Sequence, residues 1–78
     1  MKQQNKIFFS TIMQRLSQQV GFEVRPNRLA VLIHGWMKKH PEQAPSYNTL
    51  FARKKKDGQP WLSRQETDNL ARYAGYQI

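Results

Sequence analysis

The densest cluster of charge in the sequence consists of four consecutive basic residues, Arg53, Lys54, Lys55 and Lys56. Just before them comes a run of side chains that form hydrogen bonds, made up of Ser46, Tyr47, Asn48 and Thr49. A helix N-terminus that carries such side chains close to several basic residues is suited to binding phosphates and the edges of nucleic-acid bases. We therefore expect the lysines to contact a phosphate backbone, with Tyr47, Asn48 or Arg53 contacting bases.

Other basic residues lie near the ends of predicted helices and are further candidates for phosphate contact. They are Arg25, Arg28, Lys38, Lys39 and Arg64. A run of Lys and Arg is usually no more than a solvated face. Here 13 Lys and Arg stand against 5 Asp and Glu, which gives a formal net charge of +8 at pH 7 and favours a polyanionic partner.

Catalysis has little support in the pattern of residues. His34 and His40 are six positions apart, on different faces of one predicted helix, and we expect the first to be partly buried and the second to lie at the helix end. The carboxylates are scattered, and the sequence has no glycine-rich phosphate loop or nucleophile motif. We predict no enzyme activity, no metal site and no cofactor.

The length of 78 residues allows a single small domain, residues 1–78. The sequence contains no cysteine, which excludes disulfides and thiolate zinc sites and suits a reducing cytoplasm. The apolar run at 7–13 is too short for a signal peptide or a membrane span. We expect a cytoplasmic protein that has no contact with membranes.

Hydrophobic periodicity predicts an all-α bundle of about four helices. The first helix covers residues 6–20, with Asn5 as its N-cap and Gly21 as its left-handed C-cap, and Phe22 is available to fold back on the last turn.

The second helix begins near Pro26 and ends at Lys38, Lys39 and His40, with Pro41 just beyond. Its apolar stripe is Leu29, Leu32, Ile33, Trp36 and Met37. Gly35 inside this helix indicates that another helix packs closely there or that the helix bends.

The third predicted helix covers 47–56, with Ser46 as its N-cap and Asp57 and Gly58 at its end. We expect its apolar residues, Tyr47, Leu50 and Phe51, to point inward, and its four basic residues to point outward. Ser63 and Glu66 form a capping box that starts a fourth helix over 64–74, which Gly75 ends. As an alternative, residues 54–62 could form a hairpin around Asp57 and Gly58, giving a basic wing.

The end of the first helix resembles the end of the fourth, since residues 16–24 match residues 70–78 in type. Both segments have the form of a glycine-capped helix end with an aromatic residue folded back. The same form, L-(S/A)-x-x-(V/A)-G-(F/Y), resembles the first helix and turn of helix-turn-helix regulators of the phage repressor and Cro type. In that register residues 25–35 resemble the recognition helix, although Leu29 and Leu32 come two positions late.

A second register of the same family is equally open. Residues 46–50, the Gly58-x-Pro60-x-Leu62 turn and residues 70–75 resemble the recognition helix, turn and following helix, without the short helix that should precede Ser46 directly. The resemblance implies a double-stranded DNA-binding regulator of the kind that phages and mobile elements encode. It also implies a homodimer on paired half-sites, for which exposed apolar residues of the first helix are the candidate surface.

Two other functions stay open at this point. The basic face could dock on an acidic protein, as in an inhibitor or recruiter of a nuclease complex. Alternatively, Trp36 and Trp61 could stack on the bases of single-stranded nucleic acid, although tryptophans in so small a domain more often anchor the core.

Overall fold

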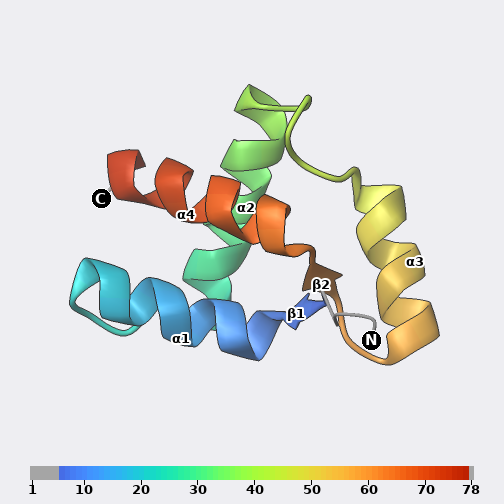
Figure 1. Ribbon diagram of the computed structural model, residues 1–78, viewed down its shortest axis with the longest axis horizontal. Helices are drawn as coiled ribbons and strands as arrows, with labels where there is room; N and C mark the ends of the chain where they lie inside the picture. The colour runs from blue at the N-terminus through green and yellow to red at the C-terminus, as the bar shows by residue number, and fades with distance from the viewer. Residues whose placement is uncertain (1–5, 78) are drawn as a thin grey trace.

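The computed structural model describes residues 6–77, which form four helices and one short pair of strands in the order β1-α1-α2-α3-β2-α4 (Figure 1). The helices are α1 (Phe9–Val20), α2 (Pro26–Lys39), α3 (Tyr47–Asp57) and α4 (Arg64–Gln77). The strands are β1 (Ile7–Phe8) and β2 (Trp61–Leu62). The prediction of four helices is confirmed, and the first helix starts at Phe9 rather than at residue 6. The predicted N-cap Asn5 lies outside the described residues.

The strand pair was not predicted. Ile7 lies opposite Leu62 and Phe8 opposite Trp61 in an antiparallel ladder of two residues each. Two residues are too few for an alternating pattern to show in the sequence, and the partners are more than fifty positions apart. The ladder ties the start of α1 to the segment between α3 and α4.

The core lies where α4 packs against α1 and α2. Trp36 of α2, Ile12 and Leu16 of α1, and Leu70 of α4 are almost completely buried. The expected stripe of α2 is confirmed at its four buried members, with Met37 partly buried beside them. Trp36 is therefore a packing anchor, as expected, and is not available for stacking on a base.

Gly35 of α2 lies against the side chain of Tyr73 on α4. A Cβ atom at Gly35 would lie 2.4 Å from the hydroxyl oxygen of Tyr73. Of the two explanations that the sequence left open for this glycine, close packing of a second helix is therefore confirmed.

The two matching helix ends behave differently. Gly21 ends α1 in the left-handed conformation, with φ of 85°, and its N–H donates a hydrogen bond to the Ser17 carbonyl. Gly75 has no positive φ, and α4 continues through it to Gln77, so the prediction that it ends the helix is wrong. The side chain of Tyr76 is 88% exposed instead of folded back. Leu70, Ala71, Tyr73 and Ala74 keep contact with the core along α4, and this packing continues the helix past the glycine.

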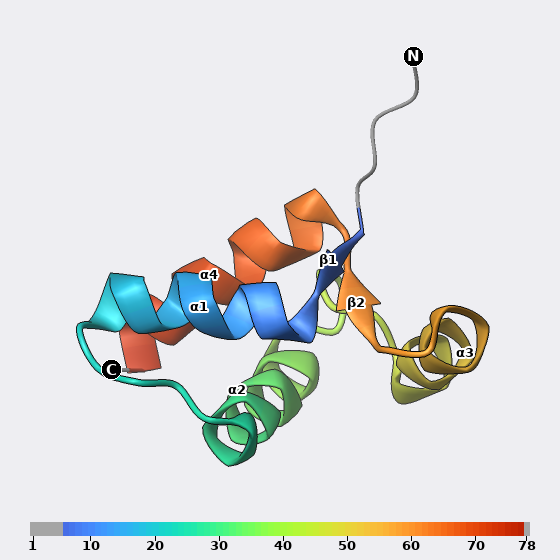
Figure 2. The same cartoon turned by 90° about the horizontal axis from the view of Figure 1, so that it is seen from below.

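Helix α3 stands to one side of the other three helices, as both ribbon views show (Figures 1 and 2). It begins with the predicted cap, because the Ser46 hydroxyl accepts a hydrogen bond from the Thr49 N–H, and it ends at Gly58 with φ of 81°. Residues 54–57 are helical, so the alternative of a basic hairpin wing is wrong. Leu50 is buried, but Tyr47 and Phe51 are 57% and 63% exposed, and the prediction that they point inward is also wrong.

Candidate nucleic-acid interface

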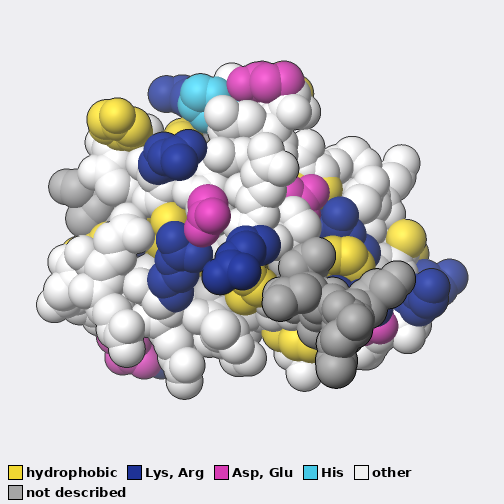
Figure 3. Space-filling view, viewed as in Figure 1, with side chains coloured by type: hydrophobic (Ala, Val, Ile, Leu, Met, Phe, Trp, Pro, Cys, Tyr) yellow, Lys and Arg dark blue, Asp and Glu magenta, His cyan; other side chains and the backbone are white. Residues whose placement is uncertain are grey.

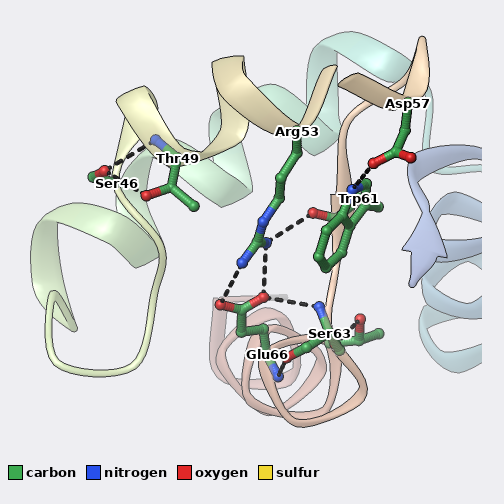
Figure 4. A network of polar contacts seen from close by, with 8 residues as sticks. Ser46, Thr49, Arg53, Asp57, Trp61, Ser63 and Glu66 are labelled. Carbon is green, nitrogen blue, oxygen red and sulfur yellow. Dashed lines mark hydrogen bonds and ion pairs between the residues drawn. The ribbon is translucent and has the colours of Figure 1, made fainter. Parts of the chain in front are cut away.

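A polar brace fixes the position of α3 relative to β2 and α4 (Figure 4). Arg53 donates hydrogen bonds to both carboxylate oxygens of Glu66, at 2.9 and 3.4 Å, and to the Trp61 carbonyl at 3.0 Å. Its guanidinium also lies 4.0 Å from the centre of the Trp61 ring. The Trp61 indole N–H donates to Asp57 at 2.8 Å, and Lys6 pairs with the same carboxylate at 3.1 Å.

Arg53 is thus the exception among the four consecutive basic residues. We expected all four to point outward, but the Arg53 side chain is only 17% exposed and makes internal contacts. A planar guanidinium can bridge a carboxylate, a carbonyl and an aromatic face at once, which a sequence pattern does not reveal. We therefore leave Arg53 out of the candidate interface.

The two carboxylates of the brace have lowered pKa values. Hydrogen bonds from Lys6 and then Trp61 hold the pKa of Asp57 below its ordinary value. Partial burial raises the pKa of Glu66, but the hydrogen bonds from Arg53 and from the Ser63 N–H outweigh burial and leave it lowered. The capping box is confirmed, since Ser63 and Glu66 exchange hydrogen bonds at 2.8 and 3.1 Å.

With Leu50, Arg53 and Asp57 turned toward the rest of the fold, the opposite side of α3 faces solvent. Four exposed residues share that side at helical spacing i, i+3, i+4 and i+7. They are Asn48, Phe51, Ala52 and Lys55, which we call the outer stripe of α3. Sequence reasoning selected Asn48 and Lys55 but missed Phe51 and Ala52. The same spacing, counted from Asn48, was the signal that could have found them.

The other candidate residues at the start of α3 either cap the helix or contact α2. Ser46 and Thr49 are exposed, and their hydroxyls bond to each other at 3.0 Å in the helix cap. The Tyr47 hydroxyl makes a short hydrogen bond with Nδ1 of His34 on α2, so Tyr47 faces α2 rather than the outer stripe. His34 is exposed, and the prediction that it is partly buried is wrong. His40 lies at the end of α2, as expected, and is half-buried.

Lys55 of the outer stripe and its neighbours Lys54 and Lys56 are all exposed. The ion pairs within residues 6–77 involve Lys6, Arg15, His40 and Arg53, and none of these three lysines. Lys38 lies instead near the start of α3, because it lines one hollow together with Ser46 and Tyr47. The structure thus brings the start of α3 and the end of α2 together.

The remaining candidates lie elsewhere. Arg25 and Arg28 line a hollow at the start of α2, where Arg28 lies over the Phe22 ring, 6.0 Å from its centre. Phe22 is 45% exposed there. Arg64 lies at the start of α4, where it lines a hollow together with Asp68.

Lys and Arg side chains also gather over α1 and α4 (Figure 3). Asp68 pairs with Arg15 of α1 at 2.9 Å, lines one hollow with Arg72 and lines another with Arg64. Sequence reasoning missed Arg15 and Arg72, although the four-residue spacing of Arg64, Asp68 and Arg72 was a visible sign. Because Asp68 neutralises part of the charge on this face, we rank it below α3 as a nucleic-acid surface.

Helix α1, which was expected to carry exposed apolar residues for a homodimer, has no fully exposed ones. Phe9, Met13 and Val20 of that helix pack against the core and are at most partly exposed. The exposed large hydrophobic residues of the described chain are elsewhere, namely Phe22, Val31, Tyr47, Phe51 and Tyr76.

Across residues 6–77 no group of three or more His, Asp or Glu side chains is placed to hold a metal ion. In the same residues no helix combines the length and apolar character that a membrane span needs. Comparisons of the chain with protein-family models, curated proteins and solved structures found no match.

Proposed function

We propose that this protein binds double-stranded DNA by placing the outer stripe of α3 in the major groove. The observation that carries the proposal is the placement of α3, which stands to one side of the core with one side held by Leu50, Arg53 and Asp57. Because α3 is already fixed in place, its exposed side can be presented to base edges with little loss of conformational entropy on binding.

The outer stripe has the chemistry for contacts with bases. An Asn amide pairs with the N6 and N7 edge of adenine, and Lys donates to the O6 and N7 acceptors of guanine. Ala52 lies between Asn48 and Lys55, and its small side chain lets the helix backbone approach the bases and contact a thymine methyl group. Phe51 adds a second apolar contact at the edge of the stripe.

Lys54 and Lys56 flank the stripe and supply contacts with phosphates, and Lys38 and Lys39 at the end of α2 extend the basic surface. Such contacts give affinity for any DNA sequence and depend strongly on salt, because each neutralised phosphate releases counterions. The formal net charge of +8 supports the same partner.

Of the two helix-turn-helix registers, we favour the one in which α3 is the recognition helix. In the other register α2 would have this role, but α2 packs against α4 and shares the core with α1, whereas α3 stands to one side of the other three helices (Figure 1). The connection between α2 and α3, residues 40–46, is longer than the usual helix-turn-helix turn of three or four residues. The orientation of α3 on DNA would therefore differ from that of the recognition helix in that family. The resemblance favours a role in transcriptional regulation for a phage or mobile element, in the cytoplasm.

The single-strand alternative loses support. Trp36 is fully buried, and the Trp61 ring has Arg53 and Lys6 against it, at 4.0 and 5.4 Å from its centre. Stacking on bases requires an open aromatic face.

The proposal is tested by fluorescence anisotropy with random-sequence duplex DNA at three salt concentrations, with single-stranded DNA as competitor. We expect micromolar binding that weakens steeply with salt, and loss of binding in the Lys54→Glu/Lys55→Glu variant. The double variant Arg64→Glu/Arg72→Glu on α4 changes the net charge by the same amount, so it is the matched control and should retain most of the affinity. Selection of preferred sites should then yield a short motif that Asn48→Ala relaxes at one position.

Absence of binding at low salt overturns the proposal, and the basic surface is then a docking site for an acidic protein. Equal loss in the control variant overturns the assignment to α3. Preference for single strands over duplex overturns the choice of duplex DNA.

A further inference from the structure

An apolar groove runs between α2 and α3, separate from the outer stripe. Two adjoining hollows form it, of about 400 and 480 Å³. The first is lined by residues that include Met37, Pro41, Ala44 and Pro45, and the second by Phe9, Val31 and Leu50. Each volume is in the range of sites that take up apolar groups of substantial size.

His34 and Tyr47 line both hollows, and their hydrogen bond bridges the groove at its middle. Two of the residues along the groove are exposed well beyond what a core residue would be, since Val31 is 68% and Tyr47 57% exposed. Contiguous apolar surface of this kind on a highly charged domain is typical of a contact site for another molecule.

Charge at the groove is of one sign. Lys38 lines the hollow at the start of α3. Lys54 does not line either hollow, but it is exposed two helical turns after Tyr47 and therefore on the same side of α3, one turn beyond Leu50 of the second hollow. Within the described chain, the lining of the two hollows contains no Asp or Glu. A complementary partner would carry apolar side chains with carboxylates beside them.

We infer that the groove binds an acidic amphipathic helix of another protein. Such a helix would lie between α2 and α3 with one apolar side chain in each hollow, on either side of the His34 and Tyr47 bridge, and with carboxylates toward Lys38 and Lys54. A second copy of this chain fits less well, because both copies carry a formal net charge of +8 and the same lysines at the groove. This inference goes beyond DNA binding and does not depend on it.

The test uses a fluorescein-labelled synthetic helix of eighteen residues, with Leu at i, i+4 and i+7 and Glu on both flanks. Two matched peptides serve as controls, one with every Glu replaced by Lys and one with the same composition in scrambled order. We expect micromolar binding of the acidic helix alone, with amide shift changes in ¹⁵N spectra centred on Val31, His34 and Tyr47.

Val31→Glu should weaken this binding by about tenfold or more, because it places a like charge at an apolar contact. Val31 is exposed, so its replacement leaves the core intact, and circular dichroism verifies the fold. Tyr76→Ser is the control, because it removes a large hydrophobic side chain that is 88% exposed and lies outside the groove, and it should leave binding unchanged.

Three results overturn the inference. They are no binding up to millimolar peptide, equal binding of the scrambled peptide, and shift changes confined to residues outside the groove. Self-association that Val31→Glu abolishes would also overturn it, in favour of a second copy as the occupant. DNA binding is measured separately, so either proposal can fail while the other stands.

Discussion

Arg53 of α3 donates hydrogen bonds to both carboxylate oxygens of Glu66 at the start of α4, at 2.9 and 3.4 Å. The two residues are only 17% and 19% exposed at their side chains. Glu66 also accepts from the Ser63 N–H, so one carboxylate both starts α4 and holds α3. This pairing fixes the direction in which α3 presents its outer stripe.

Arg53→Lys keeps the charge but should loosen α3. A lysine cannot donate in parallel to two carboxylate oxygens and to the Trp61 carbonyl, so we expect the free energy of unfolding to fall by about 1 to 3 kcal/mol. Amide exchange in α3 should become faster, while Lys55→Arg on the outer stripe changes neither quantity. Urea denaturation and hydrogen exchange provide the measurements. Unchanged stability and exchange in Arg53→Lys would show that the brace does not hold α3.

Acid should destabilise the fold through the same brace. Glu66 and Asp57 have lowered pKa values in the folded protein, against ordinary values of 4.5 and 3.8. Well above pH 4.5 both carboxylates are charged in the folded and unfolded chains, and their stabilisation is complete. As the pH falls further, the unfolded chain takes up protons first, so the free energy of unfolding decreases until the folded carboxylates are protonated as well.

The pH effect is measured by urea denaturation between pH 7 and pH 2.5. Glu66→Gln should be less stable at pH 7 and should show a shallower loss of stability in acid, because it no longer titrates. A Glu42→Gln variant is the control, since Glu42 lies in an exposed ion pair with His40 at 3.6 Å. A loss in acid as steep in Glu66→Gln as in the native chain would exclude Glu66 as the cause.

The contact between Gly35 and Tyr73 predicts a coupled pair of substitutions. Gly35→Ala places a methyl group 2.4 Å from the Tyr73 hydroxyl oxygen, so we expect a loss of about 1 to 3 kcal/mol in the free energy of unfolding. In the Tyr73→Phe background the nearest remaining ring carbon is at 3.4 Å, and the better helix propensity of Ala, about 1 kcal/mol, offsets most of the loss. Thermal or urea unfolding of the four proteins gives the coupling energy. Additive effects would show that the two residues do not meet.

Local signals predicted the helices well. The Ser63 and Glu66 capping box, the Ser46 cap and the left-handed glycine at position 21 are each set by a few neighbouring residues, and all are found in the structure. The predictions failed where distant segments decide the outcome. The strand pair joins Ile7 to Leu62, and Arg53 turns inward because of Glu66, which lies thirteen positions away on the next helix.

Only the part of the candidate site that depends on local sequence was predicted. The charge of Lys54, Lys55 and Lys56 follows from composition, so sequence reasoning found it. The direction of α3 follows from its tertiary contacts. Tyr47 was therefore expected in the core, and the groove it forms with His34 had no counterpart in the sequence analysis.

Gly21 and Gly75 occupy equivalent positions in the two matching segments, yet substitution by alanine should have opposite effects. At Gly21 the backbone has φ of 85°, which Ala adopts at a cost of about 1 kcal/mol, so Gly21→Ala should destabilise the fold. Gly75 lies within α4 without a positive φ, and a Cβ there would make an ordinary contact with Gln19 at 3.6 Å. Gly75→Ala should therefore raise the free energy of unfolding by up to about 1 kcal/mol.

Urea denaturation of the two single variants decides the matter, with Gly58→Ala, at φ of 81°, as a second destabilising reference. Destabilisation by Gly75→Ala comparable to that by Gly21→Ala would mean that α4 ends at Gly75 in solution, as the sequence repeat alone suggests. Opposite signs would show that packing of Leu70, Ala71, Tyr73 and Ala74 on the core, rather than the local motif, decides where α4 ends.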